Sequence, residues 1–99
     1  MRVVLAARAR ADLRDIARFI ARDNPVRAVS FVRDIQTSLR ALGEQPLAFP
    51  VEPRFERLGV RRKPYRDYLI FYLPTDAAVN ILRILHGARD YAALPLADR

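Results

Sequence analysis

The chain has 99 residues, a formal net charge of +7, a hydrophobic share of 52% and no cysteine. The lack of cysteine excludes disulfides and thiolate metal sites, and a single histidine, His86, excludes a histidine-rich metal site, so we expect no cofactor. No apolar stretch approaches the roughly 20 residues that span a bilayer, so we expect a cytoplasmic protein with no membrane partner.

The beginning of the chain predicts a short strand and then a helix. Residues 3–5 are a largely β-branched run that predicts the strand. Apolar residues then recur at helical spacing in an otherwise charged segment, which predicts an amphipathic helix; they are Ala9, Leu13, Ile16, Ala17 and Ile20. Ala7 and Arg8 cannot accept hydrogen bonds from the first free amides, so this helix lacks a good N-terminal cap.

A second helix is predicted to begin at Asn24-Pro25. Asn24 can cap it, and Pro25 suits the first helical position because its missing N–H needs no partner there. Gly43 is expected to end the helix in a left-handed conformation. The apolar stripe between these ends comprises Ala28, Phe31, Ile35, Leu39 and Leu42. Two amphipathic helices with a tight joint form an αα-hairpin, which needs a sheet to bury its stripes.

The second half of the chain has the pattern of a sheet. Residues 44–53 contain three prolines and predict a loop, and later breaks fall at Pro64 and at Pro74-Thr75-Asp76. The strand candidates between these breaks are residues 58–63, 67–73 and 79–86. Short joints favour an antiparallel meander, and residues 68–72, apolar on both faces, predict a central strand. We therefore expect an α+β fold, with an N-terminal strand and an αα-hairpin packed on an antiparallel sheet, in one domain spanning residues 1–99.

Nearly all the positive charge is arginine, since Lys63 is the only lysine. Arginine binds carboxylates and phosphates through paired hydrogen bonds, so the partner could be an acidic protein segment or a nucleic acid, with a plain solvated surface as the alternative. A simple nucleic-acid-binding module would need exposed aromatic side chains among its arginines, and only Tyr65 fits. The densest basic patch, which we expect to contact a partner, comprises Arg54, Arg57, Arg61, Arg62, Lys63 and Arg66.

Four segments carry a family resemblance: Ala11-Asp12-Leu13 with Ile16; Asn24-Pro25, Arg27-Ala28 and Phe31; Val60-Arg61-Arg62 with Tyr68-Leu69-Ile70-Phe71-Tyr72; and Ile81-Leu82-Arg83-Ile84-Leu85-His86-Gly87-Ala88-Arg89-Asp90. With these segments the chain resembles the RelE/ParE superfamily, and in particular a ParE-like toxin of a type II toxin–antitoxin system. The last segment is the most specific, because these toxins often close with a strand ending in Arg-x-x-His-x-x-Arg-Asp. The resemblance implies an αα-hairpin on an antiparallel sheet, and a cognate ParD-like antitoxin, acidic and partly disordered, in a hetero-oligomer with the toxin.

RelE-type members of the superfamily are endoribonucleases that cut messenger RNA on the ribosome. Such cleavage needs a base, an acid and cations around one phosphate, and the candidates for a metal-independent site here are Arg83, His86, Arg89 and Tyr91. Two features oppose this activity. Arg83 and His86 would point to opposite faces of a regular strand, and Leu69 follows Tyr68 where ribonuclease members tend to carry an arginine.

The ParE branch instead disables DNA gyrase and has no established hydrolytic residues. Its signature is closer to this chain, especially in the run from Leu85 to Asp90. The resemblance thus implies a gyrase inhibitor that causes growth arrest without being an enzyme, with the ribosome or messenger RNA as the alternative target. Under this interpretation His86 is a structural residue at a strand end, and Arg83 either contacts a partner or pairs with Asp90 or Glu52.

Overall fold

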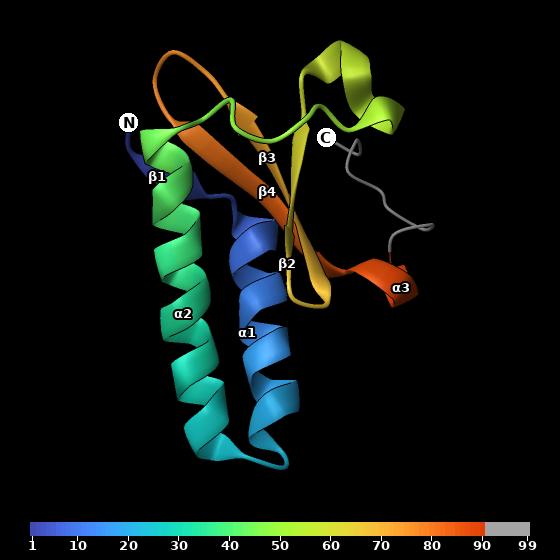
Figure 1. The fold of residues 1–99 in the computed structure, drawn as a ribbon. Coiled ribbons are helices and arrows are strands. Elements are labelled where there is room, and N and C mark those ends of the chain that lie inside the picture. The colour runs from blue at the N-terminus through green and yellow to red at the C-terminus, as the bar shows by residue number, and fades with distance from the viewer. Residues whose placement is uncertain (91–99) are drawn as a thin grey trace.

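The computed structural model describes residues 1–90 of the chain. A helical hairpin, formed by α1 and α2, lies on one side of a four-stranded sheet (Figure 1). The elements in chain order are β1 (Val3–Leu5), α1 (Ala7–Ala21), α2 (Pro25–Glu44), the 3-10 helix η1 (Pro53–Leu58), β2 (Arg61–Tyr65), β3 (Tyr68–Pro74), β4 (Val79–His86) and the short α3 (Gly87–Asp90). None of the helices in residues 1–90 is long and apolar enough to cross a membrane.

The sheet has the strand order β1-β4-β3-β2. Strands β2, β3 and β4 form the expected antiparallel meander, and β3, predicted to be central, has a neighbour on each side. Strand β1 departs from the all-antiparallel expectation, because it pairs with β4 in parallel over Val3–Leu5 and Val79–Ile81. Parallel pairing needs a long crossover between the two strands, and the helical hairpin and meander supply it. The α+β fold class is confirmed, with a mixed sheet.

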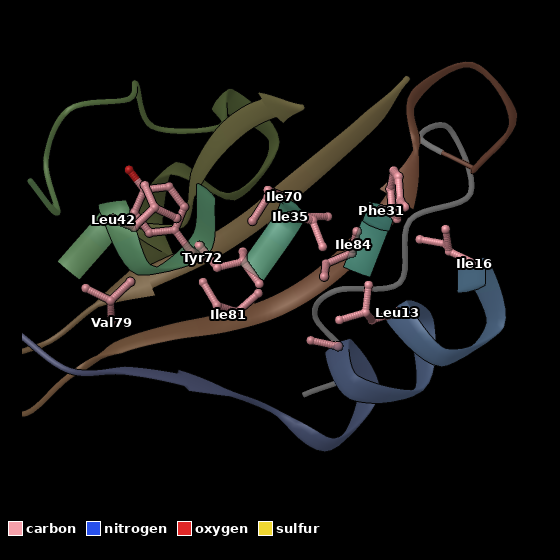
Figure 2. Close-up of a cluster of buried hydrophobic side chains, with 12 residues drawn as sticks. Leu13, Ile16, Phe31, Ile35, Leu42, Ile70, Tyr72, Val79, Ile81 and Ile84 are labelled. Carbon is pink, nitrogen blue, oxygen red and sulfur yellow. The ribbon is translucent and has the colours of Figure 1, made fainter. Parts of the chain in front are cut away.

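The main hydrophobic core lies between the hairpin and the sheet (Figure 2). The predicted stripes of both helices face inward, and Ile35 of α2 and Ile70 and Ile81 of the sheet are fully buried. Tyr72 lies in this core with no exposed surface, and its hydroxyl donates a hydrogen bond of 3.0 Å to the carbonyl of Pro46. A smaller cluster, centred on Phe71, contains no residue of α1 or α2 and therefore lies on the opposite face of the sheet.

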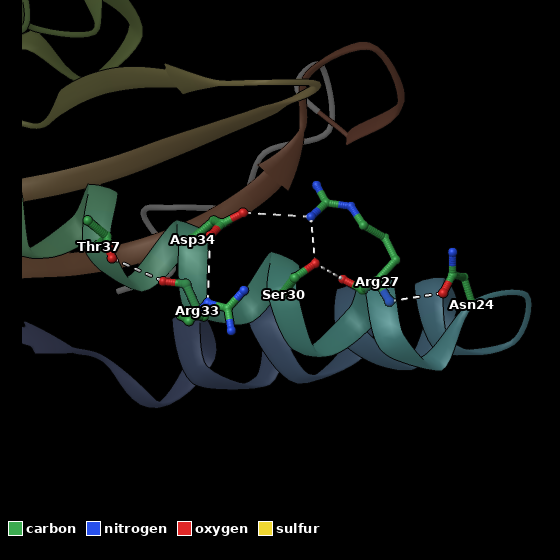
Figure 3. A network of polar contacts seen from close by, with 6 residues as sticks. All are labelled: Asn24, Arg27, Ser30, Arg33, Asp34 and Thr37. Atoms are coloured by element: carbon green, nitrogen blue, oxygen red, sulfur yellow. Dashed lines mark hydrogen bonds and ion pairs between the residues drawn. The ribbon is translucent and has the colours of Figure 1, made fainter.

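Both helix starts behave as the sequence predicts. The cap position of α1 is Ala6, which makes no side-chain capping bond. At the start of α2 the Asn24 Oδ1 atom accepts a 3.0 Å hydrogen bond from the N–H of Arg27 (Figure 3).

The predicted role of Gly43 is wrong, because α2 continues to Glu44 and Gly43 has no positive φ. Glycine is needed there for space, since a Cβ atom would collide with the Met1 carbonyl.

The predicted start of the first meander strand is also wrong. Residues 53–58 form η1, which ends at Gly59 in a left-handed conformation with φ 77°, so β2 begins only at Arg61. Pro64 lies inside β2 where a break was expected. The N–H of Arg62 points away from β3 and donates to the Pro50 carbonyl. The nitrogen of Pro64, two residues later, faces the same way, so its missing N–H removes no hydrogen bond between β2 and β3.

Candidate functional site

The sheet face turned away from the helices carries two of the predicted arginines on either side of one aromatic residue. Phe71 on β3 pairs in register with Arg62 on β2 and with Arg83 on β4. Phe71 is fully buried, and the apolar residues packed around it on this face are Phe55, Val60, Leu69, Leu82 and Leu85. We call this side of the sheet the outer sheet face.

Arg83 is held by a carboxylate that the sequence did not suggest. Its Nε and Nη2 atoms donate hydrogen bonds of 2.8 and 3.0 Å to the two carboxylate oxygens of Asp12 on α1. The Oδ2 atom of Asp12 also accepts the backbone N–H of Ile84 at 2.9 Å. Strand β1 covers the edge of β4 only as far as Ile81. Asp12 therefore supplies an acceptor where the edge of β4 has no strand partner.

Arg62 has a buried carboxylate partner of its own. Its Nη1 atom lies 3.1 Å from Oε1 of Glu52, whose side chain has no exposed surface. The second oxygen of Glu52 accepts the N–H of Arg54 at 3.1 Å and so caps η1. A buried charge is stable only when it is paired and hydrogen-bonded, so Arg62 is required by the fold. The sequence suggested Glu52 as one of two possible partners of Arg83. In the structure Arg83 is bound to Asp12, and Glu52 binds Arg62.

Two further residues of the basic patch bind backbone carbonyls, Arg61 in the loop between α2 and η1 and Lys63 in α2 itself. The Nη1 atom of Arg61 donates to the Phe49 carbonyl at 2.6 Å and to the Leu47 carbonyl at 3.4 Å. The ammonium of Lys63 donates to the Ser38 carbonyl at 2.9 Å, and partial burial lowers the pKa of Lys63. Arg61 thus fastens the loop before η1 to β2, and Lys63 joins β2 to the backbone of α2.

The rest of the basic patch is exposed. Arg54, Arg57 and Arg66 are open to solvent, with the guanidinium of Arg54 over the Phe55 ring and that of Arg66 over the Tyr65 ring. The patch predicted from the sequence therefore divides into a half that supports the fold and a half that is accessible. Contact with a partner remains a prediction for these exposed arginines.

Of the four ribonuclease candidates, the structure describes the side chains of Arg83 and His86, which lie on opposite faces of the sheet. His86 lies edge-on to Tyr68 with ring centroids 5.6 Å apart, and Tyr68 packs against the core on the helix side of the sheet. Arg83 instead pairs in register with Phe71, whose side chain lies on the other face, so Arg83 and His86 point to opposite faces as expected. Tyr91 and the side chain of Arg89 lie outside the described residues. Within residues 1–90 no group of three or more His, Asp or Glu side chains could hold a metal ion.

The two arginines on the outer sheet face are poorly placed to bind a phosphate. A phosphate needs cations that are free to approach it, whereas Arg62 and Arg83 each bind an internal carboxylate. Leu69 belongs to the apolar cluster, where a ribonuclease would need a cation.

The comparisons with known proteins agree with this fold. The family model of the ParE toxin of the type II toxin–antitoxin system parDE matches residues 3–91. A solved structure described as the chromosomal ParDE toxin–antitoxin system from P. aeruginosa is similar, with a TM-score of 0.75 and 24% sequence identity over 87% of this chain and 95% of that chain. At this identity the structural likeness shows the fold alone. No curated protein sequence matches the chain.

Proposed function

The chain belongs to the ParE toxins of type II toxin–antitoxin systems, and we propose that it stops growth by binding DNA gyrase in the cytoplasm. In this proposal residues 1–99 act as one toxin domain. The toxin works by occupying gyrase and catalyses no reaction. An acidic, ParD-like antitoxin neutralises it by binding tightly in a hetero-oligomer.

The ion pairs of Arg83 with Asp12 and of Arg62 with Glu52 carry this proposal. Side-chain exposure is 13% for Arg83 and 14% for Asp12, so the first pair is largely withdrawn from solvent. Removing one partner of such a pair costs about 3–5 kcal/mol, and a substrate phosphate would have to compensate for that loss. These contacts support inhibition by binding over cleavage of RNA.

The exposed arginines support an acidic antitoxin as the second partner. Arg54 and Arg57 are accessible, and the whole chain carries a net charge of +7. A disordered acidic segment gains charge-assisted hydrogen bonds at such a surface while it folds. If a small acidic protein is encoded beside this chain, its co-expression should restore growth. Failure to rescue would contradict this part of the proposal.

Pulse labelling after induction of the chain without its antitoxin tests the target. One label follows DNA synthesis and a second follows protein synthesis in the same bacterial culture. We expect DNA synthesis to stop first while translation continues. If translation stops first, the gyrase proposal is wrong, and cleavage of messenger RNA by a RelE-type mechanism replaces it.

A folding control makes the labelling result specific. Ile35 is fully buried in the main core, and an Ile35→Asp substitution would place an unpaired charge there, which prevents folding. This variant should leave both kinds of synthesis unaffected. An arrest by the unfolded variant would show that the effect does not need the toxin fold.

A further inference from the structure

The turn between β2 and β3 contains a residue type that its backbone does not favour. Tyr65 pairs with Tyr68, so the turn consists of Arg66 and Asp67. Arg66 has a φ of 53°, and among residues 1–90 it is the one non-glycine residue with a positive φ. Two-residue hairpin turns favour asparagine or glycine at such positions, because a larger side chain is strained there. Backbone strain in a folded protein is a reason to look for a function.

The guanidinium of Arg66 is held in one place at the end of the sheet. It lies 5.5 Å from the centre of the Tyr65 ring, and a hydrogen bond with Tyr65 raises the pKa of Arg66. The ring of Tyr65 in turn packs edge-on against Phe31, with 5.9 Å between centroids. The turn itself is fixed by a 2.9 Å hydrogen bond from the N–H of Gly87 to the carbonyl of Asp67. The arginine is therefore pre-organised and exposed.

We propose that Arg66 is a partner-contact residue that binds a carboxylate on the protein target of the toxin. This inference rests on the proposed function, in which the target is gyrase. An ordered guanidinium loses less side-chain freedom when it binds a carboxylate through two parallel hydrogen bonds. Arginine and tyrosine are also the residue types that most often dominate the binding energy of protein interfaces.

The surroundings of Arg66 favour a protein carboxylate over a nucleic acid. The Tyr65 ring is covered by Arg66 and Phe31, and the Tyr68 ring lies between Phe31 and His86, so neither is open for a base to stack on. Arg27, the other arginine over this aromatic cluster, is bound to Ser30 and Asp34 (Figure 3). Binding to a DNA backbone depends on several phosphate contacts, whereas one ordered guanidinium suffices for one carboxylate.

The substitutions Arg66→Gly and Arg66→Asn separate function from stability. Both new residues tolerate a positive φ, so we expect melting temperatures equal to or above that of the wild type. Inhibition of purified gyrase by the full chain should nevertheless require about thirtyfold more protein, the loss at the threshold of an interface hot spot. The control Arg40→Gln removes the same charge from an exposed position on α2 and should leave inhibition unchanged.

Each result of this experiment decides something different. Unchanged inhibition by both Arg66 variants would overturn the proposal. It would also be overturned if the Arg66 variants melted at a lower temperature and Arg40→Gln lost as much inhibition as they did. If the variants lose affinity for a fluorescein-labelled DNA duplex and keep their effect on gyrase, phosphate is the ligand and the carboxylate proposal is wrong. If the wild type arrests growth without inhibiting gyrase, the proposed target fails, and growth arrest by the same variants then decides the role of Arg66.

Discussion

Asp12 on α1 binds Arg83 on β4 through two hydrogen bonds of 2.8 and 3.0 Å, across 71 residues of sequence. The same carboxylate accepts the N–H of Ile84. One side chain thus fastens the first helix to the last strand of the sheet, beyond the point where β1 ends. This contact joins the two halves of the fold, and it engages an arginine that the sequence offered as a candidate for RNA cleavage.

The Asp12–Arg83 contact should make a large contribution to stability. We expect Asp12→Ala to lower the free energy of unfolding by about 3 kcal/mol, because it leaves a largely buried arginine without its carboxylate. Urea unfolding followed by circular dichroism measures the change. Asp15→Ala removes an exposed aspartate of the same helix and should change stability by less than about 0.5 kcal/mol. Equal losses in the two variants would contradict the structural role of Asp12.

Glu52 should be needed for the position of η1. A Glu52→Gln substitution keeps the shape of the side chain but removes the charge that Arg62 and the N–H of Arg54 bind. We expect a loss of about 1–3 kcal/mol in the free energy of unfolding, as for a buried hydrogen-bonded group that loses its partner. The matched control is Glu56→Gln on the exposed side of η1, for which chemical denaturation should detect almost no change.

Tyr72 should make the fold sensitive to alkaline pH. Burial raises the pKa of Tyr72 above its ordinary value of 10.0, so the folded state favours the neutral phenol. The unfolded chain loses the phenol proton first, near pH 10. Burial of the neutral phenol therefore stabilises the folded state fully below that pH, and this contribution falls as the pH rises through the pKa of Tyr72 in the folded state. Tyr72→Phe lacks this titration. Its stability between about pH 9 and 11 should fall less steeply than that of the wild type, and parallel pH profiles in denaturant would contradict this assignment.

Gly43 should resist substitution although it lies inside a helix. Alanine is ordinarily about 1 kcal/mol better than glycine in a helix, but its Cβ atom would collide here with the Met1 carbonyl. We expect Gly43→Ala to destabilise the protein by about 1–3 kcal/mol, the range for overpacking. Thermal unfolding measures it against Arg40→Ala on the exposed face of α2. A gain in stability for Gly43→Ala would show that β1 can move away from α2.

His86 should be dispensable for toxicity. It packs edge-on against Tyr68, and it points to the opposite face of the sheet from Arg83, which is bound to Asp12. We expect His86→Ala to arrest growth as fully as the wild type when both are induced to the same level, with unfolding curves as the check on folding. A loss of toxicity in a variant that is still folded would restore the catalytic interpretation.

Much of the fold follows from local patterns in the sequence. The inward stripes of α1 and α2, the Asn24 cap and the meander were predicted because helical spacing, capping chemistry and short joints are properties of neighbouring residues. The parallel pairing of β1 with β4 was missed because it depends on contacts between residues 76 positions apart, such as Val3 and Val79. The start of β2 was missed because the left-handed Gly59 ends a 3-10 helix that apolar periodicity does not reveal.

The candidate site was harder to predict, for a related reason. The basic patch was visible as a run of arginines, but sequence spacing gives no sign of which of them bind internal groups. Arg61 binds loop carbonyls and Arg62 binds Glu52, because the segment before η1 folds back along β2. Arg83 could be singled out because it belongs to the motif of the last strand. Its partner Asp12 could not, because it is one of several aspartates and was expected on a solvated helix face.

The proposal that the chain binds and inhibits gyrase is tested most directly with purified components. Supercoiling of relaxed plasmid by gyrase is measured with increasing amounts of the purified full chain. A messenger RNA incubated with the same chain, with and without ribosomes, serves as the parallel substrate. We expect supercoiling to stop while the RNA stays intact. Active gyrase together with cut RNA would contradict it.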